Sequence, residues 1–149
     1  MSAKKQVKQA NNPQQKQVIQ RAVSTDNQKM VWVFDSVDTD DCFRFDPNRG
    51  DFDAADIFDK LIHYSKRTWS DLKKETHDEG KSKHHFLDKA RFSPEAESRI
   101  SKLHLEERRD QIFSLHLTNR CRIIGLREQE RFIVKWYDPE HKFCPSRKK

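Results

Sequence analysis

Glycine is scarce in this sequence, with only three residues in 149: Gly50, Gly80 and Gly125. A loop that wraps a phosphate group in backbone N–H groups needs several glycines at short spacing. No such cluster is present, so the sequence gives no sign of a nucleotide-binding loop.

Cysteine is equally sparse. Cys42, Cys121 and Cys144 are odd in number, far apart, and lack Cys-x-x-Cys spacing. This pattern is typical of reduced thiols in a cytosolic protein and does not fit a disulfide framework or a structural zinc site.

Long apolar runs are also missing. No segment approaches the ~20 apolar residues that span a bilayer, and no signal-peptide pattern begins the chain. We therefore expect a cytoplasmic protein without a membrane partner.

Charge, in contrast, is abundant. Lysine and arginine number 30 against 24 aspartate and glutamate, which gives a net charge of +6 and a pI near 9.3. A basic balance favours a polyanionic partner, most often nucleic acid. The alternative is a protein that merely carries excess lysine, but basic side chains recur within the predicted sheet as well as at the ends.

The length predicts one domain with tails. Residues 1–29 are rich in Gln, Asn and Lys and poor in apolar groups, so we predict a disordered basic tail there. It is either an arm that contacts phosphates or an extension without a role, since Met30 could begin the domain. Residues 30–146 form the predicted domain, and 147–149 a short basic C-terminal tail.

The last third of the chain predicts three consecutive strands. Apolar and polar residues alternate over residues 111–117, 120–127 and 131–141, as in an antiparallel sheet with one buried face. Turns are expected at Thr118-Asn119 and at residues 128–130. Phe132, Val134 and Trp136 should share the inward face, and the other face should be open.

The upstream chain predicts a strand at Met30–Val37 with a partner strand at Cys42–Phe45, followed by helices. One helix spans Phe52–Arg67, with Asp51 or Asp53 as its N-cap, and a short helix begins at Thr68. In the helix over Phe52–Arg67, the predicted apolar stripe is Ala55, Phe58, Leu61 and Ile62. After a loop over His77–His85, another helix spans Ser93–Asp110, with Ser93 as cap and Pro94 at the first helical position.

The fold class is therefore α+β: an N-terminal strand, two to three helices, then a C-terminal three-stranded antiparallel meander. An acidic stretch precedes and enters the first helix, and its carboxylates could gather a metal ion. It does not match a calcium-binding EF-hand loop, and capping and turn formation explain most of it. We therefore predict no metal site and no cofactor.

The end of the chain, FSLHLTNRCRIIGLREQERFIVKWYDPEHKFCPS, resembles a family of small bacterial proteins with no assigned activity. That family shows FSLS, then RVHG or RIHG, then FYVVWLDPNHKLYP. The matching residues here are Phe113-Ser114-Leu115, Arg122-Ile123-Ile124-Gly125, Phe132, Trp136, Asp138-Pro139-Glu140-His141-Lys142 and Pro145.

Upstream, the family carries a Trp-x-x-Phe helix start and an HPIDW-like segment, where this chain has Trp69 and His85-Phe86-Leu87-Asp88. The resemblance covers Val31 to Ser146. Two departures stand out: Cys144 replaces a tyrosine, and another histidine precedes His85.

The order of helices followed by three strands, with arginine on the sheet, also resembles the RelE, HigB and YoeB ribosome-dependent ribonuclease toxins in layout. That resemblance implies a concave sheet face that presents Arg, Lys, His or Tyr to RNA.

Metal-independent RNA cleavage needs a base, a cation for the phosphorane and an acid. The candidates for these catalytic roles are His85, His141 and Arg122, because imidazole titrates near neutral pH and guanidinium binds phosphate through two N–H groups. The predicted nucleic-acid-binding residues on the open face are Arg120, Arg122, Arg127, Arg131 and Lys135.

Each candidate also has a structural alternative. Arg122 could pair with a cross-strand glutamate, either histidine could be structural, and Asp138-Pro139-Glu140-His141 could be only a turn.

These observations favour an RNA-binding protein, and more narrowly a metal-independent endoribonuclease of toxin–antitoxin type. Its expected partners are RNA, including ribosome-associated mRNA, and an antitoxin-like protein. One alternative is a non-catalytic interaction module of a mobile-element or phage-related system. Another is a metal-dependent nuclease that uses Asp35 and Asp46.

Overall fold

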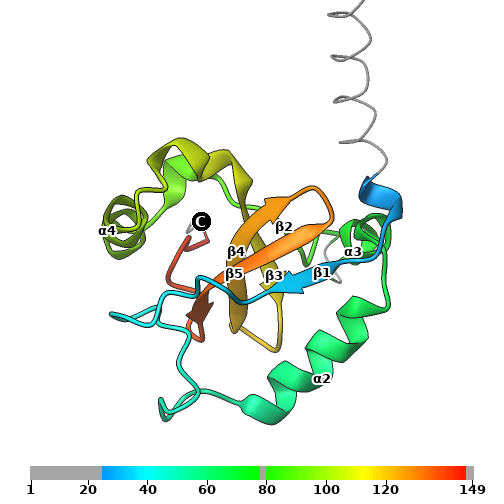
Figure 1. Cartoon of the computed structure of the whole chain (residues 1–149), viewed down its shortest axis with the longest axis horizontal. Helices are drawn as coiled ribbons and strands as arrows, with labels where there is room; N and C mark the ends of the chain where they lie inside the picture. Colours follow the sequence, from blue (N-terminus) through cyan, green and yellow to red (C-terminus); the bar gives the residue numbers. More distant parts are fainter. Residues whose placement is uncertain (1–24, 78–79, 147–149) are drawn as a thin grey trace, which may run out of the picture.

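A five-stranded mixed sheet organises the computed structural model, which describes residues 25–77 and 80–146 (Figure 1). The strand order is β1-β5-β4-β3-β2, and β1 runs parallel to β5 while the other neighbours are antiparallel. The strands are β1 (Val31–Val33), β2 (His85–Phe86), β3 (Ile112–His116), β4 (Arg122–Glu128) and β5 (Arg131–Asp138). The predicted α+β class and C-terminal meander are confirmed.

Helices begin where the sequence offers a capping side chain. The α-helices are α2 (Ala54–Ser65), α3 (Trp69–Lys74) and α4 (Pro94–Lys102), and the 3₁₀ helices are η1 (Thr25–Asn27), η2 (Lys89–Arg91) and η3 (Glu106–Gln111). Asp53, Thr68 and Ser93 cap the three α-helices through their side chains. The long helix predicted to reach Asp110 is wrong, because the backbone reverses at His104 with a φ of 58°. None of the helices described is long and apolar enough to cross a membrane.

Both faces of the sheet are covered, so the predicted open face is wrong. Helices α2 and α3 pack on one face and α4 on the other (Figure 1). Phe113, Leu115 and Phe132 face the α2 side, while Ile124 and Trp136 face the α4 side. The apolar residues on alternate positions of β3–β5 therefore supply two cores.

A β-bulge at Lys135 assigns β5 side chains to these two cores. Ile124 pairs with Trp136, but the next residue of β4, Gly125, pairs with Val134. The extra residue reverses the alternation, so Val134 and Trp136 lie on opposite faces. The prediction that Phe132, Val134 and Trp136 share one face is wrong, although all three are fully buried.

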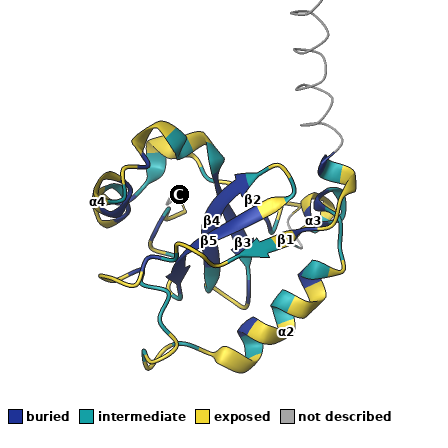
Figure 2. Cartoon of the chain, viewed as in Figure 1, coloured by how far each residue is buried: buried dark blue, intermediate teal, exposed yellow. Residues whose placement is uncertain are grey.

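The inward face of α2 also differs from the predicted stripe. Ile57 and Tyr64 are buried and Leu61 packs against them, whereas Phe58 is 63% and Ile62 57% exposed. Figure 2 shows this helix with an exposed outer side. The Tyr64 hydroxyl donates to the His116 carbonyl at 2.6 Å, a tertiary bond that helps fix the rotation of the helix.

The domain begins before Met30. Thr25 is buried, Asp26 forms ion pairs with Arg127 and Lys73, and the Gln28 carbonyl accepts the backbone N–H of Trp69. The predicted disorder is therefore wrong for residues 25–29. The rest of that tail, and residues 147–149, lie outside the described residues.

The segment after β1 is irregular. β1 ends at Val33, and the predicted partner strand at Cys42–Phe45 is wrong. Backbone bonds that hold that segment include Phe45 N–H to Asp38 O and Tyr137 N–H to Phe43 O. It covers the α4 side of the sheet with Phe43, which packs edge-to-face on Phe143.

Candidate functional site

Two adjoining hollows lie near the end of the sheet where β4 begins and β5 ends. One, of about 430 Å³, is lined on its polar side by Lys81, His85, Arg91 and Asp88. The other, of about 370 Å³, is lined by Asn119, Arg120, Arg122 and Glu140. They meet at His141 and Ser146, which line both. We call this surface the cationic cleft, after Lys81, Arg91, Arg120 and Arg122; His85 and His141 also line it.

Arg122 is the anchored cation of the cleft. It opens β4 directly opposite His116 on β3 and Asp138 on β5. Its Nη1 donates to the carbonyl oxygens of Asn119 at 2.7 Å and Cys121 at 3.0 Å. Nε and Nη2 make no hydrogen bond to any described residue and remain able to donate. Burial lowers the pKa of this guanidinium, which stays positively charged at neutral pH because its ordinary pKa exceeds 12.

His141 sits between the two hollows in a left-handed backbone conformation, with a φ of 58°. The turn that holds it is built on Asp138, whose carboxylate accepts the backbone N–H groups of Lys142 and Phe143, each at 2.9 Å. Non-glycine residues in this conformation concentrate at functional sites. Burial lowers the pKa of His141, as do the positive charges of Arg122, His85 and Arg91, so its imidazole is neutral at neutral pH.

His85 and Arg91 supply the far side of the cleft. His85 lies exposed on edge strand β2, and its Nδ1 is 3.1 Å from the Phe86 carbonyl oxygen. Arg91 on η2 is held by a 2.8 Å bond from Nη2 to the Pro145 carbonyl. The sequence reading missed Arg91 and Lys81, for which the only signal was their position on either side of the His85 segment.

Of the seven predicted site residues, four meet here: His85, Arg120, Arg122 and His141. Lys135 instead donates to the Ser36 carbonyl and hydroxyl. Arg127 is buried over the Trp69 ring and paired with Asp26. Arg131 is exposed, but it begins β5, opposite Glu128 and far along the strand from Asp138. The prediction that all these cations share one sheet face is therefore wrong. Lys135 lies at the bulge and binds Ser36, and Arg127 is held by Asp26 of η1 and Trp69 of α3.

A second group of histidines stands behind the cleft. His84 is 1% exposed, and its Nδ1 accepts the His116 backbone N–H at 3.1 Å. Nε2 must then carry the proton that it shares with Glu75 at 3.3 Å. Burial lowers the pKa of His84 to about 4. The His116 ring packs on His77, and burial followed by Arg122 lowers its pKa to about 4 as well. His84 and His116 are therefore neutral at neutral pH, and the bond between them joins the residue before β2 to β3.

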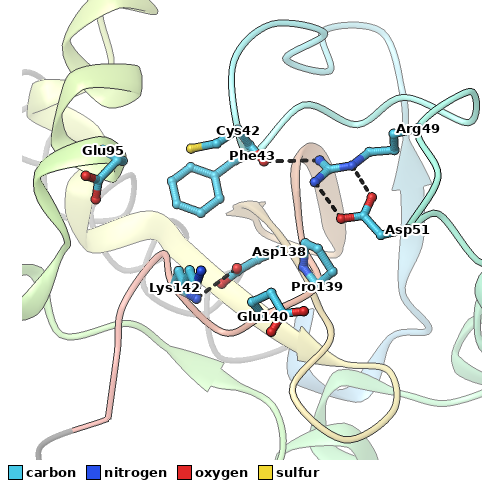
Figure 3. A pocket seen from close by; sticks show the side chains of 9 residues that line it. All are labelled: Cys42, Phe43, Arg49, Asp51, Glu95, Asp138, Pro139, Glu140 and Lys142. Atoms are coloured by element: carbon cyan, nitrogen blue, oxygen red, sulfur yellow. Dashed lines mark hydrogen bonds and ion pairs between the residues drawn. The ribbon is translucent and has the colours of Figure 1, made fainter.

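Another hollow, of about 470 Å³, has four carboxylates in its lining, from Asp51, Glu95, Asp138 and Glu140, together with Arg49 and Lys142 (Figure 3). Arg49 is bound to Asp51 and to the Cys42 carbonyl there, while Asp138 is used by its own turn. Burial raises the pKa of Asp138. Asp51 and Asp138 thus bind residues close to them in sequence.

Asp35 and Asp46, the ligands of the metal-dependent alternative, are also engaged. Asp35 accepts the Ser36 hydroxyl, and Asp46 accepts the Asn48 N–H and Arg44. Among residues 25–77 and 80–146, no three His, Cys, Asp or Glu side chains are grouped so that they could hold a metal ion.

Comparison of the chain with known proteins found no relative. The chain matches no protein-family model, no curated protein and no solved structure.

Proposed function

We propose that the protein binds RNA in the cationic cleft. The cleft is lined by Arg91, Arg120 and Arg122, and the hydrogen bonds of Arg122 to described residues use only its Nη1. Arginine forks match phosphate oxygens, and a cleft of one sign concentrates a polyanion. Asp88, which caps η2, and Glu140, which pairs with Arg120 at 3.8 Å, offset part of this charge, but the lysine and arginine side chains that line the cleft outnumber these two acids.

Within this function we propose metal-independent cleavage of RNA. The observation that carries it is the position of His141: neutral, half-buried, and next to both Arg122 and His85. A neutral imidazole can remove the proton of a ribose 2′-hydroxyl. Arg122 would stabilise the added negative charge on the phosphorane.

This cleavage reaction needs no reactant other than the RNA and the two histidines. The 2′-oxygen forms a bond to phosphorus while its proton passes to His141, and the P–O5′ bond breaks. His85, when protonated, gives its proton to the departing 5′-oxygen. The products are a 2′,3′-cyclic phosphate and a 5′-hydroxyl.

The test uses matched single-stranded oligonucleotides, one all-RNA and one with a single 2′-deoxy residue at the cleavage position. We expect cleavage of the first, with a cyclic phosphate seen by mass spectrometry, and none at the modified position of the second. Cleavage should survive chelation by EDTA. Cleavage that is abolished by EDTA, or that leaves a 3′-hydroxyl, would contradict this mechanism.

A second candidate, a nucleic-acid-binding module without catalysis, is favoured by His85. Its side chain is exposed, and among the residues that the structure describes its ring lies within hydrogen-bond distance only of the Phe86 carbonyl. Salt-dependent RNA binding without strand cleavage would support this candidate. The toxin–antitoxin assignment and an antitoxin-like partner remain part of the proposal and rest on the resemblance in layout and on the cleft.

A further inference from the structure

Exposed hydrophobic side chains gather at the edge of the sheet away from the cleft. Five large apolar residues are exposed in the described part of the chain, and four of them belong to the β1 segment and α2: Val31, Phe34, Phe58 and Ile62. The Trp32 ring joins the two elements, since its Nε1 donates to the Leu61 carbonyl at 3.2 Å and it stacks on Phe34.

The two flanks of α2 differ in chemistry. Ile57, Leu61 and Tyr64 face the sheet, and Asp56 on one flank accepts a bond from Thr118 in the β3–β4 turn. Phe58 and Ile62, one position after Ile57 and Leu61, lie about 100° further around the axis on the opposite flank. The apolar flank therefore faces β1, and the polar flank faces β3.

Strand β1 leaves its outer edge unpaired. Val31 donates its N–H to Glu130, next to β5. Because successive peptide groups of a strand point to opposite sides, the N–H and C=O of Trp32 point away from β5. No described residue accepts or donates to them. A strand edge with unpaired N–H and C=O groups can hydrogen-bond to another extended segment whose backbone groups are also unpaired. The apolar side chains beside this edge would pack against the same segment.

We infer that this surface, made of the β1 edge and the apolar flank of α2, binds a second copy of the chain. Two β1 strands would pair antiparallel about a twofold axis at Trp32, which lets the two Trp32 residues exchange both hydrogen bonds. That axis keeps both α2 helices on the same side of the joined sheet. Phe58 of each copy then meets Ile62 of the other.

Charge complementarity favours a second copy over an unrelated partner. The α2 helix carries the exposed acid Asp53 at its N-cap and the exposed base Lys66 just beyond its end. Antiparallel helices place the acidic end of one beside the basic end of the other and oppose their dipoles favourably. The same surface is thus complementary to itself, as a twofold interface requires.

This assembly is independent of the proposed RNA function. β1 and β2 are the two opposite edges of the sheet, and the cationic cleft contains His85 of β2. Pairing through β1 leaves the cleft open.

Sedimentation of the full chain over a range of concentrations tests the inference. We expect a dimer whose dissociation constant rises about thirtyfold or more in Phe58→Lys, because a charge would replace a central apolar anchor. Phe58 is exposed in the single chain, so at concentrations where both proteins are monomeric their melting temperatures should be equal, and only the wild type should gain stability as concentration rises. Lys66→Glu should weaken the dimer as well. Phe86→Lys is the matched control, an exposed phenylalanine on the other edge strand, and should stay dimeric.

A wild-type protein that remains monomeric at its highest attainable concentration would overturn the inference. So would a dimer that Phe58→Lys leaves intact or that Phe86→Lys dissociates. RNA affinity of Phe58→Lys, measured in parallel, should equal that of the wild type, which separates failure of this interface from failure of the proposed function.

Discussion

Arg99 and Asp38 form a buried, two-pronged ion pair that ties α4 to the loop after β1. Nε donates to Oδ2 at 2.8 Å and Nη2 to Oδ1 at 2.9 Å. The Trp136 indole donates to the same carboxylate at 2.9 Å. One aspartate thus joins a helix, a loop and β5, and its backbone carbonyl also accepts the Phe45 N–H.

Removing Arg99 should therefore destabilise the fold. Arg99→Ala leaves the Asp38 carboxylate buried without its cation, a change that costs about 3–5 kcal/mol. Urea unfolding measures it. Arg109→Ala is the control, since Arg109 binds Glu97 at the surface, and its cost should stay below about 1 kcal/mol. Equal costs for the two variants would contradict the central role of the buried pair.

Gly125 should not tolerate a side chain. A Cβ at this position would collide with the Ile133 carbonyl across the bulge and approach the Phe132 ring. We expect Gly125→Ala to cost about 3 kcal/mol, the upper part of the usual range for overpacking. Gly50→Ala, with no atom within 4 Å of its Cβ, should be nearly neutral. Thermal melts of both variants decide the matter.

A chain shortened to begin at Met30 should be less stable than the full chain. It loses the Asp26 pairs with Arg127 and Lys73 and the Gln28 carbonyl that accepts the Trp69 N–H. The melting temperature should fall by on the order of 5 °C. Asp26→Ala should reproduce part of the loss, while Lys89→Ala, which removes an exposed pair with Asp110, should not. An unchanged melting temperature would mean that residues 25–29 add no stability.

The free energy of unfolding should decrease as the pH is lowered, because burial keeps His84 neutral in the folded protein. Its pKa is about 4 in the folded protein and about 6.5 in the unfolded chain. The unfolded state therefore binds the extra proton between these values, so stability is lost as pH drops from about 6.5 to about 4 and is constant outside that window for this group. The full effect is about 3 kcal/mol.

The measurement is urea unfolding at pH 7, 5.5 and 4.5 in the wild type and in His84→Asn. Asparagine keeps an acceptor for the His116 N–H but does not titrate, so the slope with pH should decrease. His104→Asn, at an exposed site, should leave the slope unchanged. An identical slope in all three proteins would exclude His84 as its source.

Arg122→Ala should weaken RNA binding and lower the slope of log K against log salt by about 0.7, the value for one phosphate on a single strand. Arg131→Ala is the control, an exposed cation at the opposite end of the sheet. His141→Ala should reduce cleavage more than binding if it transfers a proton. Since the pKa of His141 is lowered, cleavage should persist below pH 6.5 and be lost only as pH falls through that lowered value. Equal effects of Arg122→Ala and Arg131→Ala would show that the cations act only through net charge.

The sequence alone determined the local elements of this protein. Alternation in the last third predicted the meander, and the side chains of Asp53 and Ser93 marked helix starts, because capping and strand periodicity act between near neighbours. It also identified His85, Arg122 and His141 as candidates, through residue chemistry and a basic balance.

Only the tertiary structure decided which of those residues meet. The bulge at Lys135 reverses the faces of β5, and a one-residue shift moves every later side chain to the other face. Covering both faces turned Arg127 and Lys135 from expected RNA contacts into internal partners of Asp26 and Ser36. The cleft arises where separate chain segments end together, at Arg91, Arg122 and His141, and no local pattern encodes a distance between segments so far apart in sequence.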